Sequence, residues 1–166
     1  MKTCLKCTKS STVDLGYTSY CDAHFMQVII KRVRKHMIGV FNFKKTYYVI
    51  EGENTEDAMK LLENIYGGEL KTKKAKRSSK NTVSTLLLED VVDDFLQSFL
   101  LNTNYRLPKG IHPFIVILRK EFAEIARILK VKWKVKKSLL DEIEKDHPGT
   151  KFATLKSLKY FEENHK

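Results

Sequence analysis

The chain has few of the residues, and none of the long apolar runs, that mark several large classes of protein. Its 166 residues include three cysteines, three prolines and one tryptophan. No apolar run approaches the roughly 20 residues that a membrane-spanning helix needs. The opening residues, Met1–Cys4, lack the apolar core of a secretory signal. We therefore expect a soluble cytoplasmic protein without a membrane partner.

Negative charge is in the minority. The chain has 31 Lys and Arg residues against 20 Asp and Glu residues, a formal net charge of +11. Such an excess favours a polyanionic partner, for which RNA, DNA and an acidic membrane surface all qualify. A hydrophobic content of 42% indicates a folded chain, and the length suits one core or one domain with a small appendage.

The cysteines are odd in number and all lie within the first 21 residues, which argues against a disulfide framework. Cys4 and Cys7 form a C-x2-C pair, and Cys21 and His24 form a C-x2-H pair, with thirteen residues between Cys7 and Cys21. Three thiolates and an imidazole at this spacing complete a tetrahedron around one ion. We predict a structural Zn²⁺ site in a zinc-ribbon-like knuckle; free buried thiols beside a surface histidine are the alternative.

The knuckle leads into a segment, residues 25–37, whose apolar positions recur at helical spacing. The other face of this predicted helix is basic. A knuckle followed by a basic helix indicates RNA contact, although a solvated helix face has the same pattern. The candidate RNA-binding residues of the helix are Lys31, Arg32, Arg34 and Lys35.

A second basic run covers residues 71–80. It has no hydrophobic period, so we predict a mobile loop that grips phosphates; a solvated linker or a localisation signal is the alternative. Its candidate RNA-binding residues are Lys71, Lys73, Lys74, Lys76, Arg77 and Lys80. A third run, residues 130–137, alternates lysines with apolar residues and predicts a strand with Trp133 directed inward.

Residues 47–66 have the layout of a nucleotide-binding unit, namely an apolar strand, a short loop and an amphipathic helix. The start of such a helix is a natural phosphate site. Here the loop and the two residues after it, Glu56 and Asp57, carry four carboxylates. Each close pair of a carboxylate and a phosphate costs about 1 kcal/mol in water, because like charges repel. The same acids suit a helix start that Asn54 or Thr55 caps. We interpret Glu51, Gly52, Glu53, Asn54 and Thr55 as a degenerate phosphate loop.

The remaining pattern predicts a helix over 85–101 with its acids on the outer face, a buried strand over 112–118 and a helix over 119–129. The tail from residue 138 is expected to be helical, with an interruption at 147–149. The fold class is therefore α/β, with a zinc-ribbon-like knuckle and a truncated, mostly parallel sheet. We predict two domains, residues 1–40 and 41–166.

These segments resemble the cytoplasmic tRNA 2-thiolation protein 2 family. Its members are partner subunits in the 2-thiolation of wobble uridine, and they open with paired knuckles and a basic helix. Residues 4–24 are similar to those knuckles, with His24 in place of a cysteine. Residues 47–50 and 58–66 resemble the strand and helix around the family's S-G-G-x-S-S pyrophosphatase loop. Weaker collinear similarity continues through residues 81–104, 114–128 and 147–161.

The resemblance implies a tRNA-thiolation scaffold, and two departures from it shape the predicted function. The chain is shorter than usual family members, and acids replace the pyrophosphatase loop. We find no Ser or Cys nucleophile beside His112, His147 or His165 in the sequence. We therefore predict a non-enzymatic RNA-binding protein redeployed as a ribosome-associated factor that occupies a tRNA site in dormancy or silencing.

Three alternatives stay open. In the first, the chain still holds tRNA for a catalytic thiolation subunit, and its partner is that subunit in place of rRNA and ribosomal proteins. In the second, it retains ATP-dependent sulfurtransferase activity through Gly52 and Thr55. DNA binding ranks last, because no helix carries the Arg and Asn spacing of base readout.

Overall fold

Alternating apolar residues form the central strand of the parallel sheet. In β3 (Thr46–Ile50), Tyr47 and Val49 are buried, and their neighbours in the strand are not. The strand pairs in parallel with β4 (Lys71–Ala75) on one side and β5 (Thr82–Val83) on the other, giving the sheet order β4-β3-β5. In this computed structural model, residues 2–52, 54–77, 79–103, 105–133 and 138–164 are described.

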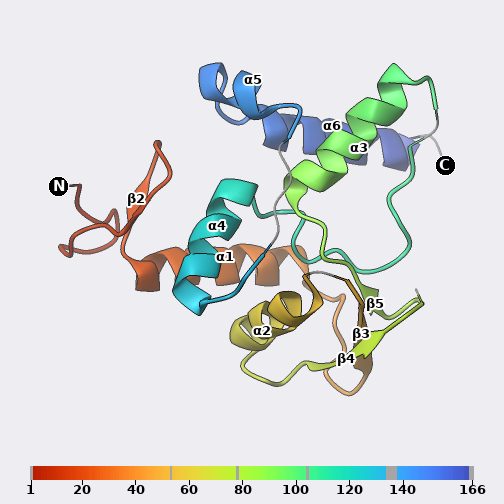
Figure 1. Ribbon diagram of the computed structural model, residues 1–166, viewed down its shortest axis with the longest axis horizontal. Helices are drawn as coiled ribbons and strands as arrows, with labels where there is room; N and C mark the ends of the chain where they lie inside the picture. Colours follow the sequence, from red (N-terminus) through yellow and green to blue (C-terminus); the bar gives the residue numbers. More distant parts are fainter. Residues whose placement is uncertain (1, 53, 78, 104, 134–137, 165–166) are drawn as a thin grey trace.

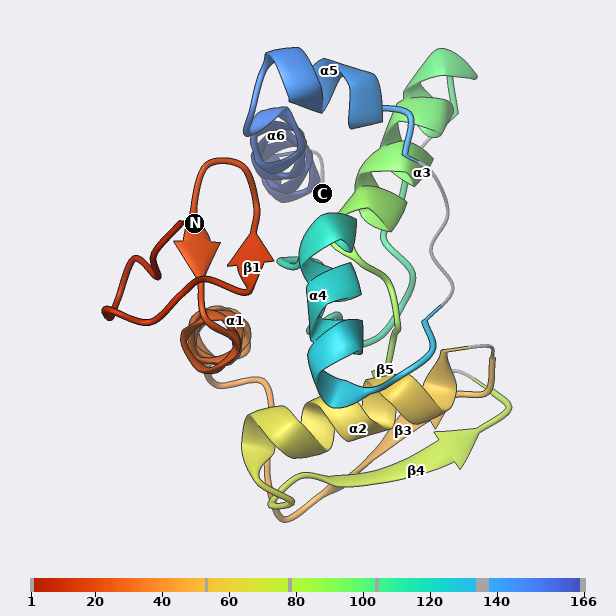
Figure 2. The same ribbon diagram turned by 60° about the vertical axis from the view of Figure 1, so that its left-hand side comes forward.

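Helix α2 (Thr55–Tyr66) covers one face of this sheet (Figure 2). Its apolar side buries Leu61, Leu62 and Ile65 against β3, as the helical spacing of these residues predicts. The helix ends at Gly67, whose left-handed conformation (φ +63°) favours glycine over other residues.

The N-terminal segment forms a hairpin of β1 (Val13–Asp14) and β2 (Ser19–Tyr20), which pair antiparallel. Helix α1 (Asp22–His36) follows at once and buries Phe25, Met26, Ile29 and Val33. These residues belong to the same hydrophobic cluster as β3 and α2, so the knuckle and the sheet share one core.

A second core lies at the other end of the molecule, where α3 (Leu88–Leu100), α5 (Asp141–Asp146) and α6 (Thr150–Asn164) gather (Figures 1 and 2). Helix α4 (Arg119–Leu129) and α1 lie between this group and the sheet. The result is a mixed α/β fold with a small parallel sheet and a cysteine-rich N-terminal knuckle, as the sequence predicts. No helix of the described part is long and apolar enough to cross a membrane.

The prediction of a strand at 112–118 is wrong. This segment consists of turns, and the N–H of Ile117 donates to the Phe114 carbonyl. Phe114 and Ile117 face the first core, whereas Ile115 and Leu118 face the second. A turn in which every third residue faces the same core therefore buries a continuous apolar run between two cores. A continuous apolar run is also the pattern of a buried strand, so the sequence alone cannot distinguish the two.

Two further segment predictions need correction. Lys71–Ala75, predicted as part of a loop, is the edge strand β4, because its pairing with β3 needs only backbone groups. The strand expected over 130–137 is absent from its described part, 130–133, and 134–137 lie outside the described residues. Trp133 is directed inward as expected, with its ring 4.0 Å from that of Phe122.

Candidate metal centre and phosphate loop

The four predicted metal ligands converge on one point. Cys4 and Cys7 come from the N-terminal loop, Cys21 is the N-cap of α1, and His24 lies in the first turn of that helix. Nδ1 of His24 lies 3.5 Å from Sγ of Cys4 and 3.4 Å from Sγ of Cys21, and Sγ of Cys7 lies 3.9 Å from Sγ of Cys21. All four ligand atoms lie within 4.8 Å of one another.

These separations fit a single tetrahedral ion. Zinc bonds of roughly 2.3 Å to sulfur and roughly 2.0 Å to nitrogen place tetrahedral ligands roughly 3.5–3.8 Å apart. Three ligand pairs of this site, at 3.4, 3.5 and 3.9 Å, bracket that range. In a four-iron cluster each ligand binds a different iron, so its ligand atoms stand much farther apart.

The hydrogen bonding of the site favours thiolate at Cys4. The backbone N–H of Lys6 donates to Sγ of Cys4 across 3.4 Å. Burial alone would raise the pKa of the Cys4 thiol, but hydrogen bonds from Cys21, Lys6 and His24 outweigh it and lower the pKa to about 6. At Cys7 a hydrogen bond from Lys9 lowers the pKa of the thiol, but burial and the neighbouring thiols of Cys4 and Cys21 outweigh it and raise the pKa overall.

The knuckle is fastened to α4 by charged contacts. Nη2 of Arg127 lies 2.6 Å from Oδ1 of Asp22, the residue after the Cys21 ligand. The hydroxyl of Thr12 donates to the same carboxylate across 2.6 Å. Nζ of Lys120 lies 4.6 Å from the centre of the Tyr17 ring. A metal that orders the knuckle therefore also orders its contact with α4.

Two of the four candidate RNA-binding residues of α1 make contacts within the protein. Nη1 of Arg32 pairs with Oε2 of Glu121 at 2.6 Å, and the guanidinium of Arg34 donates to the Ile65 carbonyl at 2.8 Å. Lys31 and Lys35 are exposed. The structure thus leaves the two lysines of this helix as the residues most available to a polyanion.

The second set of candidate RNA-binding residues lies on β4 and the loop that follows. Lys74 pairs with Glu56 at the start of α2. The other members are exposed: Lys71, Lys73, Lys76, Arg77 and Lys80.

The predicted phosphate loop joins β3 to α2, and its polar groups form hydrogen bonds with one another. The N–H of Gly52 donates to Oγ1 of Thr55 across 2.7 Å, and that hydroxyl donates back to the Ile50 carbonyl across 2.7 Å. Asn54 occupies the N-cap position without a side-chain cap bond. Glu51 is exposed, and Glu53 lies outside the described residues.

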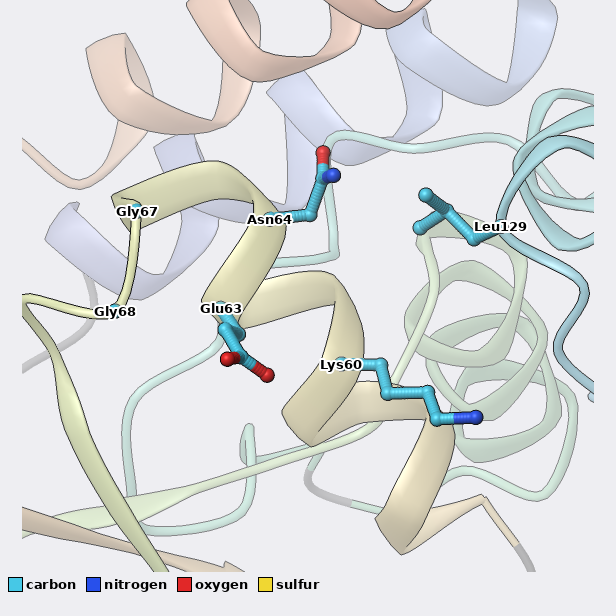
Figure 3. Close-up of a pocket in the computed structure, with 6 residues that line it drawn as sticks. All are labelled: Lys60, Glu63, Asn64, Gly67, Gly68 and Leu129. Atoms are coloured by element: carbon cyan, nitrogen blue, oxygen red, sulfur yellow. The ribbon is translucent and has the colours of Figure 1, made fainter.

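A pocket of about 490 Å³ lies away from this loop, beside the C-terminal half of α2. Figure 3 shows Lys60 and Asn64 along one side of α2, with Leu129 facing them from the end of α4. Glu63, Gly67 and Gly68 complete the lining. No cysteine or histidine lines it, so the pocket adds nothing to the metal centre.

Sequence reasoning missed a serine beside His112. Oγ of Ser84 lies 2.7 Å from Nδ1 of His112, and Nε2 of the same ring lies 2.7 Å from the Pro108 carbonyl oxygen. A carbonyl only accepts, so Nε2 carries the proton and Nδ1 accepts from the Ser84 hydroxyl. Neither residue lines the pocket beside α2. The pair ties the 108–112 loop to the residue that follows β5, and the separation of 28 positions hid it from the sequence.

Sequence reasoning also misplaced three of the four acids of α3, all of which were expected on its outer face; only Asp94 is exposed among them. Glu89 is 1% exposed and accepts from Nζ of Lys151 at 3.1 Å. Asp90 and Asp93 both face Arg119, at 2.6 and 3.4 Å. We call Glu89, Asp90, Asp93, Arg119, Asp141 and Lys151 the buried charge cluster.

Fold and site together define an α/β protein with a small parallel sheet and a Cys₃His metal knuckle. No profile of a known protein family matches the chain, and comparison with curated proteins gives no match. Among solved structures, it is similar to the U34-tRNA thiolase NcsA from Methanococcus maripaludis with its [4Fe-4S] cluster. The TM-score is 0.74 at 15% identity, over 99% of this chain and 88% of that chain. The chain therefore has the fold of a tRNA thiolase.

Proposed function

We propose that this protein is a non-catalytic, zinc-stabilised RNA-binding protein that uses a thiolase-like scaffold to hold tRNA. One observation carries the proposal. A complete four-ligand metal knuckle is joined to a fold of this kind, and acids occupy its predicted phosphate loop. The specific relationship to the cytoplasmic tRNA 2-thiolation protein 2 family is part of the same proposal.

The identity of the metal as Zn²⁺ rests on the donor set. Three sulfurs and one nitrogen within 4.8 Å suit one tetrahedral ion. The similar thiolase holds a [4Fe-4S] cluster, whereas all three cysteines of this chain belong to the knuckle. Four protein ligands close the coordination sphere, so the role of the ion is structural. Zinc is expected at one equivalent per chain, with no iron and no broad visible absorption.

The absence of catalysis is inferred from the loop at the start of α2. Its Gly52 N–H and Thr55 hydroxyl are already bonded within the loop, and the carboxylates around it repel a pyrophosphate. The competing proposal, an ATP-dependent sulfurtransferase, needs these same groups to bind nucleotide. Calorimetric titration with ATP and magnesium separates the two: we expect no heat of binding, and a micromolar dissociation constant would favour the enzyme.

RNA is the proposed ligand because the net charge is +11 and exposed lysines lie on both α1 and β4. Transfer RNA is the preferred class, since the structurally similar protein is a U34-tRNA thiolase. In this version the chain presents tRNA to a catalytic partner subunit in the cytoplasm.

A second candidate keeps the same scaffold and changes its RNA. A protein shaped for tRNA chemistry could occupy a tRNA site of the ribosome as a dormancy or silencing factor, with rRNA and ribosomal proteins as partners. The acidic loop favours this version, because a ribosome-bound factor has no use for a nucleotide. Sedimentation separates the candidates: the protein either travels with ribosomes or travels as a small complex that carries tRNA.

The direct test is tRNA binding by charge-matched variants. Lys31→Gln combined with Lys35→Gln should weaken binding and flatten its salt dependence, since each lost phosphate contact lowers the slope of log K against log salt by roughly 0.7–0.9. The control pair, Lys145→Gln with Lys156→Gln, removes the same charge from exposed positions of α5 and α6. Equal losses from both pairs would mean that only net charge matters.

A further inference from the structure

The parallel sheet has one bare face. Parallel sheets normally carry helices on both faces. Here α2 lies on one face of β3 and β4, and among the described residues no helix lies on the opposite face in either view (Figures 1 and 2). At the β5 edge that face is closed, because Thr82 is 1% exposed and receives the Ser79 N–H. The bare area therefore spans β3 and β4.

The pairing register shows which side chains belong to the bare face. Side chains alternate along a strand, and paired residues of neighbouring strands point to the same side. Tyr47 and Val49 are buried in the core with α2. Lys74, the partner of Val49 in the register, reaches Glu56 of α2. Residues of the opposite parity must point away from α2; they are Thr46, Tyr48 and Ile50 of β3 and Lys71, Lys73 and Ala75 of β4.

The bare face therefore combines an aromatic ring with cations. Tyr48 is half-buried and lies directly opposite Lys73 in the register, and both Lys71 and Lys73 are exposed. Lysines two residues apart on one strand are separated by roughly 6.6 Å, and their side chains can reach successive phosphates of an extended strand. An aromatic platform flanked by positive charge is the arrangement that binds single-stranded nucleic acid.

We propose that the bare face binds single-stranded RNA. One base stacks on Tyr48, and Lys71 and Lys73 contact the phosphates on either side. This inference rests on the proposed function and names the surface that would carry it. The basic residues beyond β4, Lys76 and Arg77, are exposed and extend the positive path along the strand direction.

The charges disfavour other occupants. A second copy of the chain on this face would set Lys71 and Lys73 against the same lysines, which repel. A partner protein with an apolar face would find little to bury, since Ile50, 37% exposed, is the one aliphatic side chain larger than alanine in the set.

The test compares a lysine of the bare face with a lysine of α2, the helix that covers the other face. Binding of a fluorescein-labelled ten-residue oligouridine to the zinc-loaded protein is followed by fluorescence anisotropy across a salt series. Lys73→Gln should weaken binding and reduce the salt slope by roughly 0.7. Lys60→Gln, at an exposed position of α2 on the covered side of the sheet, should leave both unchanged. Tyr48→Leu keeps apolar bulk but loses the flat ring, and should weaken binding by roughly 5- to 150-fold, whereas Tyr48→Phe should bind like wild type.

Each outcome bears on the inference. Equal effects of Lys73→Gln and Lys60→Gln, or unchanged binding by Tyr48→Leu at an unchanged melting temperature, would overturn the bare face as an RNA site while tRNA binding elsewhere stands. Failure of the wild-type protein to bind either oligouridine or tRNA would overturn the proposed function itself. Ultraviolet crosslinking gives an independent check: the crosslinked uridine should map to residues 46–50. A dimer in light scattering that Lys73→Gln disrupts would assign the face to a second copy and contradict the inference.

Discussion

Replacement of Lys151 by methionine should destabilise the protein far more than replacement of another lysine on the same helix. Lys151 lies in α6 with its side chain 7% exposed, between Glu89, which is 1% exposed, and Asp141. Methionine keeps most of the volume and removes the charge. Glu89 is then buried without its cation.

The structure sets the magnitude of this loss. Removal of one partner from a buried ion pair typically costs about 3–5 kcal/mol. Here two features limit the cost. The backbone N–H of Arg119 still donates to Glu89 across 2.9 Å. Burial already raises the pKa of Glu89, and the Lys151 charge opposes that rise, so without Lys151 the carboxyl takes up a proton more readily. We therefore expect about 3 kcal/mol, the lower end of the range.

Urea unfolding followed by circular dichroism measures this loss. The matched control is Lys156→Met, at an exposed position of the same helix, which should change the free energy of unfolding by no more than about 0.5 kcal/mol. The double variant Lys151→Met with Glu89→Gln should be more stable than the sum of the two single losses predicts. A Lys151→Met loss as small as that of Lys156→Met would refute the buried charge cluster.

Three further predictions follow from the structure. His24→Ala should lower the zinc content and loosen the knuckle, whereas His147→Ala, at an exposed position, should keep one zinc per chain by mass spectrometry. Burial raises the pKa of Asp141, but hydrogen bonds from Lys151 and Ser138 outweigh burial and lower the pKa overall. The ionised carboxylate therefore stabilises the fold above the ordinary pKa of 3.8, and this stabilisation is lost as the pH falls below that value. In urea unfolding at a series of pH values, Asp141→Asn should reduce the acid-induced loss of stability. Gly110→Ala places a Cβ 2.9 Å from the Thr82 carbonyl oxygen and should lower the melting temperature more than Gly149→Ala, whose Cβ meets open space.

The sequence was most informative where a function depends on local spacing. The two pairs, C-x2-C and C-x2-H, predict ligands that the structure brings within 4.8 Å of one another. The spacing of apolar residues likewise predicts α4 with its observed bounds, and the interruption at 147–149 separates α5 from α6 as expected. In each case the residues that determine the structure lie within one or two turns of each other.

The sequence failed where a partner lies far along the chain. The acids of α3 read as a solvated face, because Lys151, which pairs with Glu89, is 62 residues away. The lysines of β4 carry no apolar period, so nothing local distinguishes an edge strand from a loop. The 112–118 segment packs between two cores, and a pattern of burial alone cannot separate a turn from a strand.

The central claim is that the chain grips RNA without doing chemistry. It is tested most directly by fractionating a native extract on a sucrose gradient and sequencing the RNA that copurifies with the protein after ultraviolet crosslinking. The account predicts a complex enriched in tRNA, with crosslinks in α1 or β4; crosslinks to rRNA near a tRNA site would identify the ribosomal version. Recovery of the protein free of RNA at moderate salt would contradict the claim.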